Sequence, residues 1–305
     1  MWSEQPTGPQ QVASGSQPGQ NSSAAALLAY DVGHRAPWDW RVSLYTWTKS
    51  LASGTYLAAL LLVLLGKLGA QSAVWMYTAP LISALFLLLT GAILIFDLEH
   101  PERFYLIFTR PQWRSWLVRG GVLISAYGAL LALHLLLALL GDSAALRPLA
   151  VLLVPASILA AVYTAFLFGQ SKGRDLWQSP LLAPHLVVQA LLVGSAMTLL
   201  ETLVLAPAAA PGAAALLAAS AVVHLLLVLA ESTHPHVSAH AHQAVHHMVA
   251  GRFARWFWAG VALVALAAAA SWIASLAPVA AALALVGLLA HEHAYVQSAQ
   301  AVPLA

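Results

Sequence analysis

The sequence contains no cysteine in its 305 residues. A chain without thiols forms no disulfide, attaches no haem through a Cys-x-x-Cys-His motif, and holds no iron–sulfur cluster with its own thiolates. Any metal redox centre must therefore use histidine or belong to another subunit. Charge is also scarce, since only 8% of the residues are Asp, Glu, Lys or Arg and the formal net charge is +2. So small a net charge gives no reason to expect nucleic-acid binding.

Apolar residues make up 61% of the chain, and the mean hydropathy is +0.79. A soluble domain of this length cannot cover so much apolar surface. The composition predicts a polytopic membrane protein.

Runs of about 20 mostly apolar residues are long enough to cross a bilayer, and the sequence has eight of them. They are roughly 42–65, 74–96, 116–140, 149–169, 181–205, 213–229, 257–276 and 279–294. We therefore predict an all-α integral membrane protein, a bundle of eight transmembrane helices with both termini on one side. Residues 31–305 form this domain, and the Gln-, Ser-, Gly- and Pro-rich residues 1–30 form a disordered tail.

The predicted loops divide the basic residues unequally between the two faces. One face holds Arg35, Arg41, Arg103, Arg110, Arg114, Arg119, Lys172, Arg174, Arg252 and Arg255, and the other has Lys67 and Arg147. The positive-inside rule places the richer face, with both termini, in the cytoplasm. The alternative is that these arginines serve a protein partner.

The stretch from Phe96 to Trp116, FDLEHPERFYLIFTRPQWRSW, contains most of the clustered charge. Ionised groups are costly in hydrocarbon, so this connection must lie at the membrane surface. Its aromatic residues are typical of the membrane interface, and its two prolines interrupt helix formation. We expect a shaped surface for docking.

This stretch resembles a known family. The strings DLEHPERF at 97–104 and RP and RSW at 110–116 are similar to the D-L-x-x-P-x-R-F and R-P-x-x-R-S-W signatures of the NrfD-like family, the membrane subunits of polysulfide reductase and related complexes. Tyr45-Thr46-Trp47, Gly54, Tyr163-Thr164 and Glu231 extend the resemblance over most of the chain.

The resemblance implies a haem-free anchor in the bacterial inner membrane that binds menaquinone or ubiquinone. It also implies a ferredoxin-like [4Fe–4S] subunit and a molybdopterin or similar catalytic subunit as partners. In better-known members these lie on the periplasmic side, whereas the charge count predicts the cytoplasm. The residues expected to dock the partner are Asp97, Glu102, Arg103, Arg110, Arg114 and Glu231.

A quinone headgroup needs a hydrogen-bond donor at each carbonyl and a source of protons. Lys49, inside the first span, is a candidate because an ionisable group at that depth usually serves a function; the alternative is a lysine that snorkels to the interface. Tyr45 lies one turn before it on the same stripe. The resemblance adds Tyr163 of the fourth span, for which the alternative is an interfacial tyrosine.

Other polar residues give weaker signals. His185 and His224 lie near the loop-rich face and are expected to border the quinone site. His134 and Glu201 lie towards the opposite interface. Either a role in a proton path or simple solvation is open for His134, and for Glu201 we favour solvation. The segment 291–295, HEHAY, is expected to leave the eighth helix and pack against the partner.

Histidine is concentrated between the sixth and seventh spans, at His234, His236, His240, His242, His246 and His247. Pairs four residues apart share a helical face and can bind Zn²⁺ or Cu²⁺. Because the run has no Asp, Glu or Cys, we favour a protonatable docking surface or a solvated loop.

Two other functions remain open. A cytochrome b-like subunit needs histidines paired across helices at matched depth, and the sequence allows one haem rather than two. A transporter should show interrupted helices in corresponding halves, and no such pair is evident.

Overall fold

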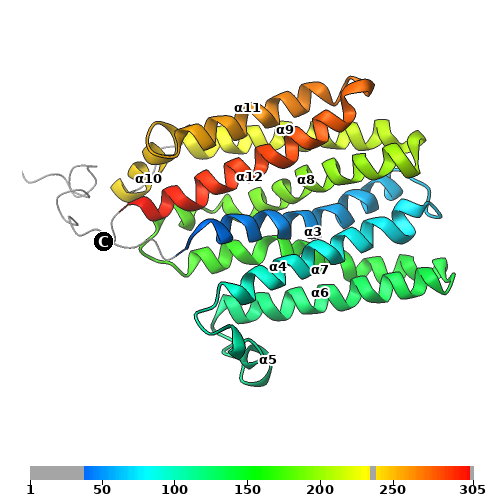
Figure 1. The fold of residues 1–305 in the computed structure, drawn as a ribbon, viewed down its shortest axis with the longest axis horizontal. Coiled ribbons are helices and arrows are strands. Elements are labelled where there is room, and N and C mark those ends of the chain that lie inside the picture. The colour runs from blue at the N-terminus through cyan, green and yellow to red at the C-terminus, as the bar shows by residue number, and fades with distance from the viewer. Residues whose placement is uncertain (1–37, 234–237, 303–305) are drawn as a thin grey trace, which may run out of the picture.

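The computed structural model describes residues 38–233 and 238–302, and every regular element in these ranges is helical. The helices run nearly side by side in an elongated bundle (Figure 1). The long helices are α3 (Trp40–Leu64), α4 (Ala79–Phe96), α6 (Trp116–Leu139), α7 (Ser143–Gly169), α8 (Leu182–Leu205), α9 (Ala210–Thr233), α11 (Ala254–Ala270) and α12 (Ala277–Ala301). Shorter elements are η1 (Val74–Thr78), η2 (Pro101–Arg103), α5 (Leu106–Thr109), η3 (Asp175–Gln178), η4 (Pro207–Ala209), α10 (Ala239–Val249) and η5 (Ala274–Leu276). The predicted tail at 1–30 lies outside the described residues.

Seven helices of the described chain are long and apolar enough to cross a membrane. The helices α10 and α11 pass the same test together, although the chain bends by 67° between them, so the number of spans rises to as many as eight. The prediction of an all-helical, multi-span membrane protein is confirmed. One prediction about the last span is wrong, because α12 continues to Ala301. The segment 291–295 is therefore helical and does not leave the bundle.

Both described ends of the chain lie at the same end of the bundle, together with α5 and α10 (Figure 1). We call this the loop-rich end. Short turns close the opposite end. Two of them follow Gly66 and Gly141, which adopt positive φ angles of 66° and 77° just after α3 and α6. Glycine reaches this conformation without the steric penalty of a Cβ atom, so these residues end their helices cleanly.

Helix α3 lies at the centre and packs against α4, α7, α8 and α12. Its interior face is rich in small and hydroxyl-bearing residues, as is typical of helices that pack closely within a membrane. The closest approach is to α8. A Cβ atom on Gly54 would lie 1.7 Å from the carbonyl oxygen of Ala190, and one on Gly194 would lie 2.0 Å from the backbone of Gly54. The two backbones are therefore in direct contact.

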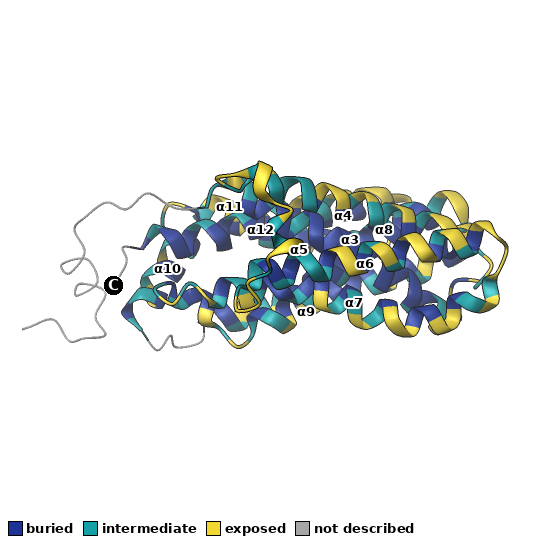
Figure 2. Ribbon diagram, turned by 90° about the horizontal axis from the view of Figure 1, so that it is seen from below, coloured by how far each residue is buried: buried dark blue, intermediate teal, exposed yellow. Residues whose placement is uncertain are grey.

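Exposed positions lie on the outer surface of the bundle (Figure 2), and many of them carry large apolar side chains. Examples on α4, α6, α9 and α11 are Leu81, Leu85, Leu88, Leu136, Leu226, Leu229 and Leu266. An apolar surface of this extent around a bundle with polar residues inside requires lipid as its neighbour.

The contact between α3 and α8 predicts that Gly54→Ala will destabilise the bundle. The new methyl group would meet the Ala190 carbonyl, and overpacking of this kind costs about 1 to 3 kcal/mol or more. The measurement is the thermal unfolding temperature of the detergent-extracted protein. Gly91→Ala in α4 is the matched control, because nothing lies within 4 Å of its added Cβ. Equal unfolding temperatures for the two variants would contradict the close packing.

Candidate functional site

Buried polar residues gather in the half of the bundle nearest the loop-rich end. They come from α3, α7, α8, α9 and α12 and are Tyr45, Lys49, Tyr163, Thr164, His185, His224, Glu231, His291 and Glu292. We call them the interior polar cluster. Polar and ionisable groups inside a transmembrane bundle are costly, so their concentration in one place marks a functional site.

Lys49 lies at the centre of this cluster. Its Nζ atom donates hydrogen bonds of 2.6 Å to the carbonyl oxygen of Ala161 and 2.6 Å to Oγ1 of Thr164. It also lies 5.1 Å from the centroid of the Tyr163 ring, a cation–π distance. The side chain is completely buried. Lys49 therefore points into the bundle and does not snorkel to the interface.

Glu292 of α12 is a buried carboxyl group that interacts electrostatically with Lys49, although the two form no direct ion pair within the described residues. The carboxylate also interacts with the hydroxyl of Thr46. It is 2% exposed, and its Oε1 atom has no hydrogen-bond partner among the described residues. We missed Glu292 because we expected the segment 291–295 to leave the helix and pack against the partner. A usable signal was present, since no glycine or proline interrupts the chain from His291 until Pro303.

Tyr163 is buried beside Lys49, and it is not an interfacial tyrosine. Its side chain is 1% exposed, and its hydroxyl has no hydrogen-bond partner in the part of the chain that the structure describes. Gly120 of α6 makes room for the ring, because a Cβ atom there would lie 2.4 Å from it. Tyr45, 2% exposed, interacts electrostatically with Tyr163. The three residues predicted from α3 and α7 therefore meet.

His185 and His224 lie together, as expected, but with partners that the sequence did not indicate. His185 Nδ1 lies 2.9 Å from Oε2 of Glu231, and His185 Nε2 lies 2.9 Å from Nδ1 of His224. The ring of His291 lies 4.9 Å from the ring of His224. The structure thus places Glu231 with the interior histidines and not on the docking surface where we expected it.

At the opposite end, His134 and Glu201 are buried, so the expectation that water solvates Glu201 is wrong. His134 Nδ1 lies 3.3 Å from the hydroxyl oxygen of Tyr56, and His134 Nε2 lies 3.2 Å from the carbonyl oxygen of Trp75. Thr78 donates a 2.5 Å hydrogen bond to Glu201. Trp75 and Thr78 belong to the π-helix η1, a distortion often found at functional sites.

The histidine-rich segment forms α10 as far as it is described. His242 and His246 lie one turn apart on the exposed side of this helix, as the spacing predicted. His234 and His236 lie outside the described residues. The three histidines that the structure brings within metal-binding distance are instead His185, His224 and His291.

The charged loop between α4 and α6 is exposed at the loop-rich end. Glu102, Arg103, Arg110 and Arg114 all face solvent. The loop and the start of α6 also enclose a groove of about 390 Å³, in which apolar side chains alternate with Glu99, Arg103 and Arg110. These groups make no ion pair with the rest of the bundle in the described residues. They are therefore available to a partner.

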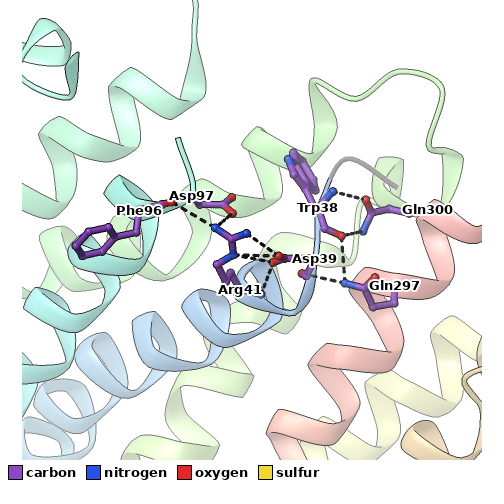
Figure 3. Close-up of polar contacts among 7 residues, drawn as sticks. All are labelled: Trp38, Asp39, Arg41, Phe96, Asp97, Gln297 and Gln300. Carbon is purple, nitrogen blue, oxygen red and sulfur yellow. Dashed lines mark hydrogen bonds and ion pairs between the residues drawn. The ribbon is translucent and has the colours of Figure 1, made fainter. Parts of the chain in front are cut away.

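Asp97 differs from the rest of the loop because Arg41 holds it. Arg41 lies 3.6 Å from Asp97, donates to the carbonyl of Phe96 at 3.3 Å, and pairs with Asp39 at 2.9 Å (Figure 3). Partial burial raises the pKa of Asp97, while the positive charge of Arg41 opposes that shift. Asp97 thus fixes the loop to the start of α3.

The start of α3 is also joined to the end of α12. Gln300 accepts a 2.9 Å hydrogen bond from the Trp38 amide and donates one of 3.0 Å to its carbonyl, and Gln297 donates to Asp39 (Figure 3). Arg174 caps α12, because its Nη1 donates to the carbonyl of Val302 at 2.5 Å. Burial lowers the pKa of Arg174. These contacts fix α12, which carries His291 and Glu292, relative to α3.

Comparison with known proteins agrees with this arrangement. The family model described as polysulphide reductase, NrfD matches residues 31–303, which is nearly the whole chain. The chain belongs to the NrfD family. It is also 28% identical over 145 residues to a putative membrane subunit of a dimethyl sulfoxide reductase from Halobacterium salinarum. That alignment covers 40% of this chain and 33% of the relative, so the chain spans about a third of the length of the curated relative it matches.

The NrfD signature residues lie in two different parts of the structure. The DLEHPERF and RPQWRSW strings form the exposed loop and the start of α6, whereas Tyr163-Thr164 and Glu231 belong to the interior polar cluster. The NrfD match therefore includes both a surface and an interior site. The surface lies at the same end of the bundle as the cluster (Figure 1).

The central position of Lys49 predicts that Lys49→Met will destabilise the protein by about 1 to 3 kcal/mol, because the Ala161 carbonyl and the Thr164 hydroxyl then lose their buried donor. The double variant Lys49→Met/Glu292→Gln should lose less free energy of unfolding than the two single variants lose in sum, by about 0.5 to 3 kcal/mol. Denaturant unfolding in mild detergent measures this coupling. Lys67→Met, at an exposed position on the opposite end, is the control. Strictly additive costs would show that Lys49 and Glu292 do not interact.

Proposed function

We propose that this NrfD-family chain is the haem-free, quinone-binding membrane subunit of an oxidoreductase complex. In this role it passes electrons between the membrane quinone pool and an iron–sulfur subunit bound at the loop-rich end. The observation that carries the proposal is the pair of Lys49 and Tyr163. They are buried donors on different helices, and the Tyr163 hydroxyl lacks a hydrogen-bond partner within the described ranges.

An unpartnered buried hydroxyl costs about 1 to 3 kcal/mol, so its retention calls for a ligand that completes its hydrogen bonding. A quinone carbonyl is an acceptor suited to this donor. Lys49, which lies over the Tyr163 ring, supplies a second donor for the other carbonyl. Tyr45, one turn before Lys49 on α3, adds a further polar group on the side of the loop-rich end. Together these residues form a small set of directed polar groups in an apolar surrounding, which is typical of ligand sites.

Reduction of a quinone to a quinol consumes two protons as well as two electrons, and the interior polar cluster contains the groups to supply them. Glu292 interacts electrostatically with both Lys49 and His185, although no direct hydrogen bond joins it to either of them in the described residues. General acids in such positions assist proton transfer when they lie within hydrogen-bond reach of the reacting atom. We assign Glu292 to proton delivery and Lys49 and Tyr163 to headgroup binding.

His185 and His224 are less suited to hold the headgroup than we expected. His185 uses one ring nitrogen for Glu231 and the other for His224. Neither nitrogen of His185 is left for a quinone oxygen. We therefore place both histidines beside the quinone site and not in direct contact with the headgroup.

The arrangement also argues against a haem between these histidines. Imidazole nitrogens bind first-row metals at about 2 Å, so two axial ligands of one iron would lie about 4 Å apart with the macrocycle between them. His185 Nε2 and His224 Nδ1 are only 2.9 Å apart and hydrogen-bonded directly to each other. No porphyrin plane fits between them in this packing.

The chemistry of the loop-rich end supports an iron–sulfur partner. A chain without cysteine holds no iron–sulfur cluster of its own, so electrons must arrive from a subunit that does. The exposed Arg103, Arg110 and Arg114 suit an acidic, ferredoxin-like surface. The curated relative is named as a membrane subunit of a dimethyl sulfoxide reductase, which favours a molybdopterin-type catalytic subunit for this complex.

The quinone site predicts that Tyr163→Phe will lower quinone-linked turnover. Loss of one neutral donor weakens headgroup binding by about 0.5 to 1.5 kcal/mol, or about 2- to 13-fold. The assay compares quinone-linked activity with transfer from substrate to a soluble dye, which should not change. Tyr127→Phe is the matched control, because Tyr127 is also buried but donates to the Ala52 carbonyl. Unchanged quinone turnover in Tyr163→Phe would overturn the site.

The docking surface predicts that Arg103→Glu will weaken assembly with the iron–sulfur subunit. A reversed charge at an interface of opposite sign repels the partner and mainly speeds dissociation. Size-exclusion chromatography of the detergent-solubilised complex measures the loss. Arg147→Glu is the control, since Arg147 is exposed at the opposite end of the bundle. Equal retention of the partner by both variants would rule out this surface.

The charge distribution predicts that the loop-rich end faces the cytoplasm. A reporter enzyme that is active only in the cytoplasm should therefore be active when it is fused after Ala305. Activity of a reporter that works only outside the cytoplasm would show instead that the arginines serve the partner and do not set the topology.

A further inference from the structure

Three histidines from three helices meet inside the bundle. His185 of α8, His224 of α9 and His291 of α12 each offer one ring nitrogen, and these nitrogens all lie within 4.8 Å of one another. All three side chains are buried, with exposures of 1%, 1% and 2%. We call them the three-histidine group. Three imidazoles converging on one point form the ligand set of many Zn²⁺ sites.

Glu231 gives His185 the orientation that a metal ligand requires. Its Oε2 atom lies 2.9 Å from His185 Nδ1, so that nitrogen carries the proton and Nε2 is left as the electron-pair donor. A carboxylate that holds the far side of a ligand imidazole is the usual outer support of a metal site, where it fixes the tautomer and raises ligand basicity.

His291 is the independent observation that points to a ligand. Neither of its ring nitrogens has a hydrogen-bond partner among residues 38–233 and 238–302, although the side chain is almost completely buried beside the other two histidines. Buried polar atoms are nearly always paired, and leaving one unpaired costs about 1 to 3 kcal/mol. The hydrogen bond between His185 and His224 does not account for the burial of the His291 ring without partners, because His291 takes no part in that bond.

The charge balance of the group also favours a cation. Glu231 is buried, and in the described part of the chain its second oxygen has no partner and its only ion-pair contact is His185. A buried carboxylate needs a compensating positive charge. Lys49, a buried cation of the same cluster, interacts with Glu292 instead. A divalent ion held by the three imidazoles would balance Glu231 directly through His185.

We propose that the three-histidine group binds one divalent transition-metal ion, with Zn²⁺ as the ion that the donor set fits. In a tetrahedral site with Zn–N bonds of about 2.0 to 2.1 Å, ligand nitrogens lie about 3.3 Å apart. The His185–His224 distance of 2.9 Å must open by a few tenths of an ångström, and His291 must move inward. The fourth position is open, and the bound ion ties α8, α9 and α12 together.

The first test is the metal content of the complex purified from membranes after dialysis against a mild chelator. We expect wild type to hold about one more zinc per chain than His291→Gln, because the variant lacks one of the three ligands. The difference between the two samples cancels any zinc held by other subunits. His293→Gln is the matched control, since His293 lies on the same helix but outside the group. It should keep the metal.

A second test uses a variant that keeps all three histidines, so a folding defect caused by removing a ligand does not affect it. Glu231→Gln keeps all three ligands but weakens the orientation of His185, and such changes lower metal affinity about 10- to 100-fold. Titration of the complex with a zinc chelator should show this loss. X-ray absorption at the zinc edge of wild type should show three imidazole nitrogens at about 2.0 to 2.1 Å.

The outcomes separate clearly. If the complex instead holds another first-row metal, and His291→Gln loses this metal while His293→Gln keeps it, the site is supported with a different ion. Equal metal content in wild type and His291→Gln overturns the proposal, as does a wild-type complex that takes up no zinc when zinc is supplied. In that case the group is a hydrogen-bonded histidine pair with a third histidine packed against it.

Discussion

The buried charge of Lys49 is the constraint on which the rest of the structure depends. An ammonium group in the middle of an apolar bundle must be compensated by neighbouring helices, because water does not reach it. Thr164 and the Ala161 carbonyl of α7 accept its hydrogen bonds, and Glu292 of α12 interacts with it electrostatically. The lysine thus fixes the relative positions of three helices. Their packing in turn brings Tyr163 beside it.

The bundle keeps its polar chemistry inside and its apolar side chains outside. This is the reverse of a soluble protein, and it follows from having lipid as the neighbour. Small residues such as Gly54 and Gly194 allow α3 and α8 to touch, so that the hydroxyl-bearing face of α3 is covered on all sides. The docking loop lies at the end of the bundle nearest the interior polar cluster. In the proposed function, electrons therefore arrive at the same end of the bundle as the quinone site.

Much of the fold was predictable because hydropathy records which segments contact lipid. The runs at 74–96 and 181–205 correspond closely to the observed helices, and the loop signature located the charged surface. The error at 291–295 has a different cause. Charged and histidine residues near the end of an apolar run resemble a helix that has left the membrane, and sequence alone does not distinguish that case from a polar face turned inward. Glu201 was misjudged for the same reason.

The sequence by itself determined the class of protein, the family signature and the donors on α3, since these depend on composition and local spacing, and the family resemblance added Tyr163 of α7. Only the tertiary structure decided which polar residues meet. His185, Glu231 and His291 are far apart along the chain, and their contact depends on how α8, α9 and α12 are packed around α3. No local pattern encodes that packing. It arises from the close approach of small residues and from the need to pair most buried polar groups.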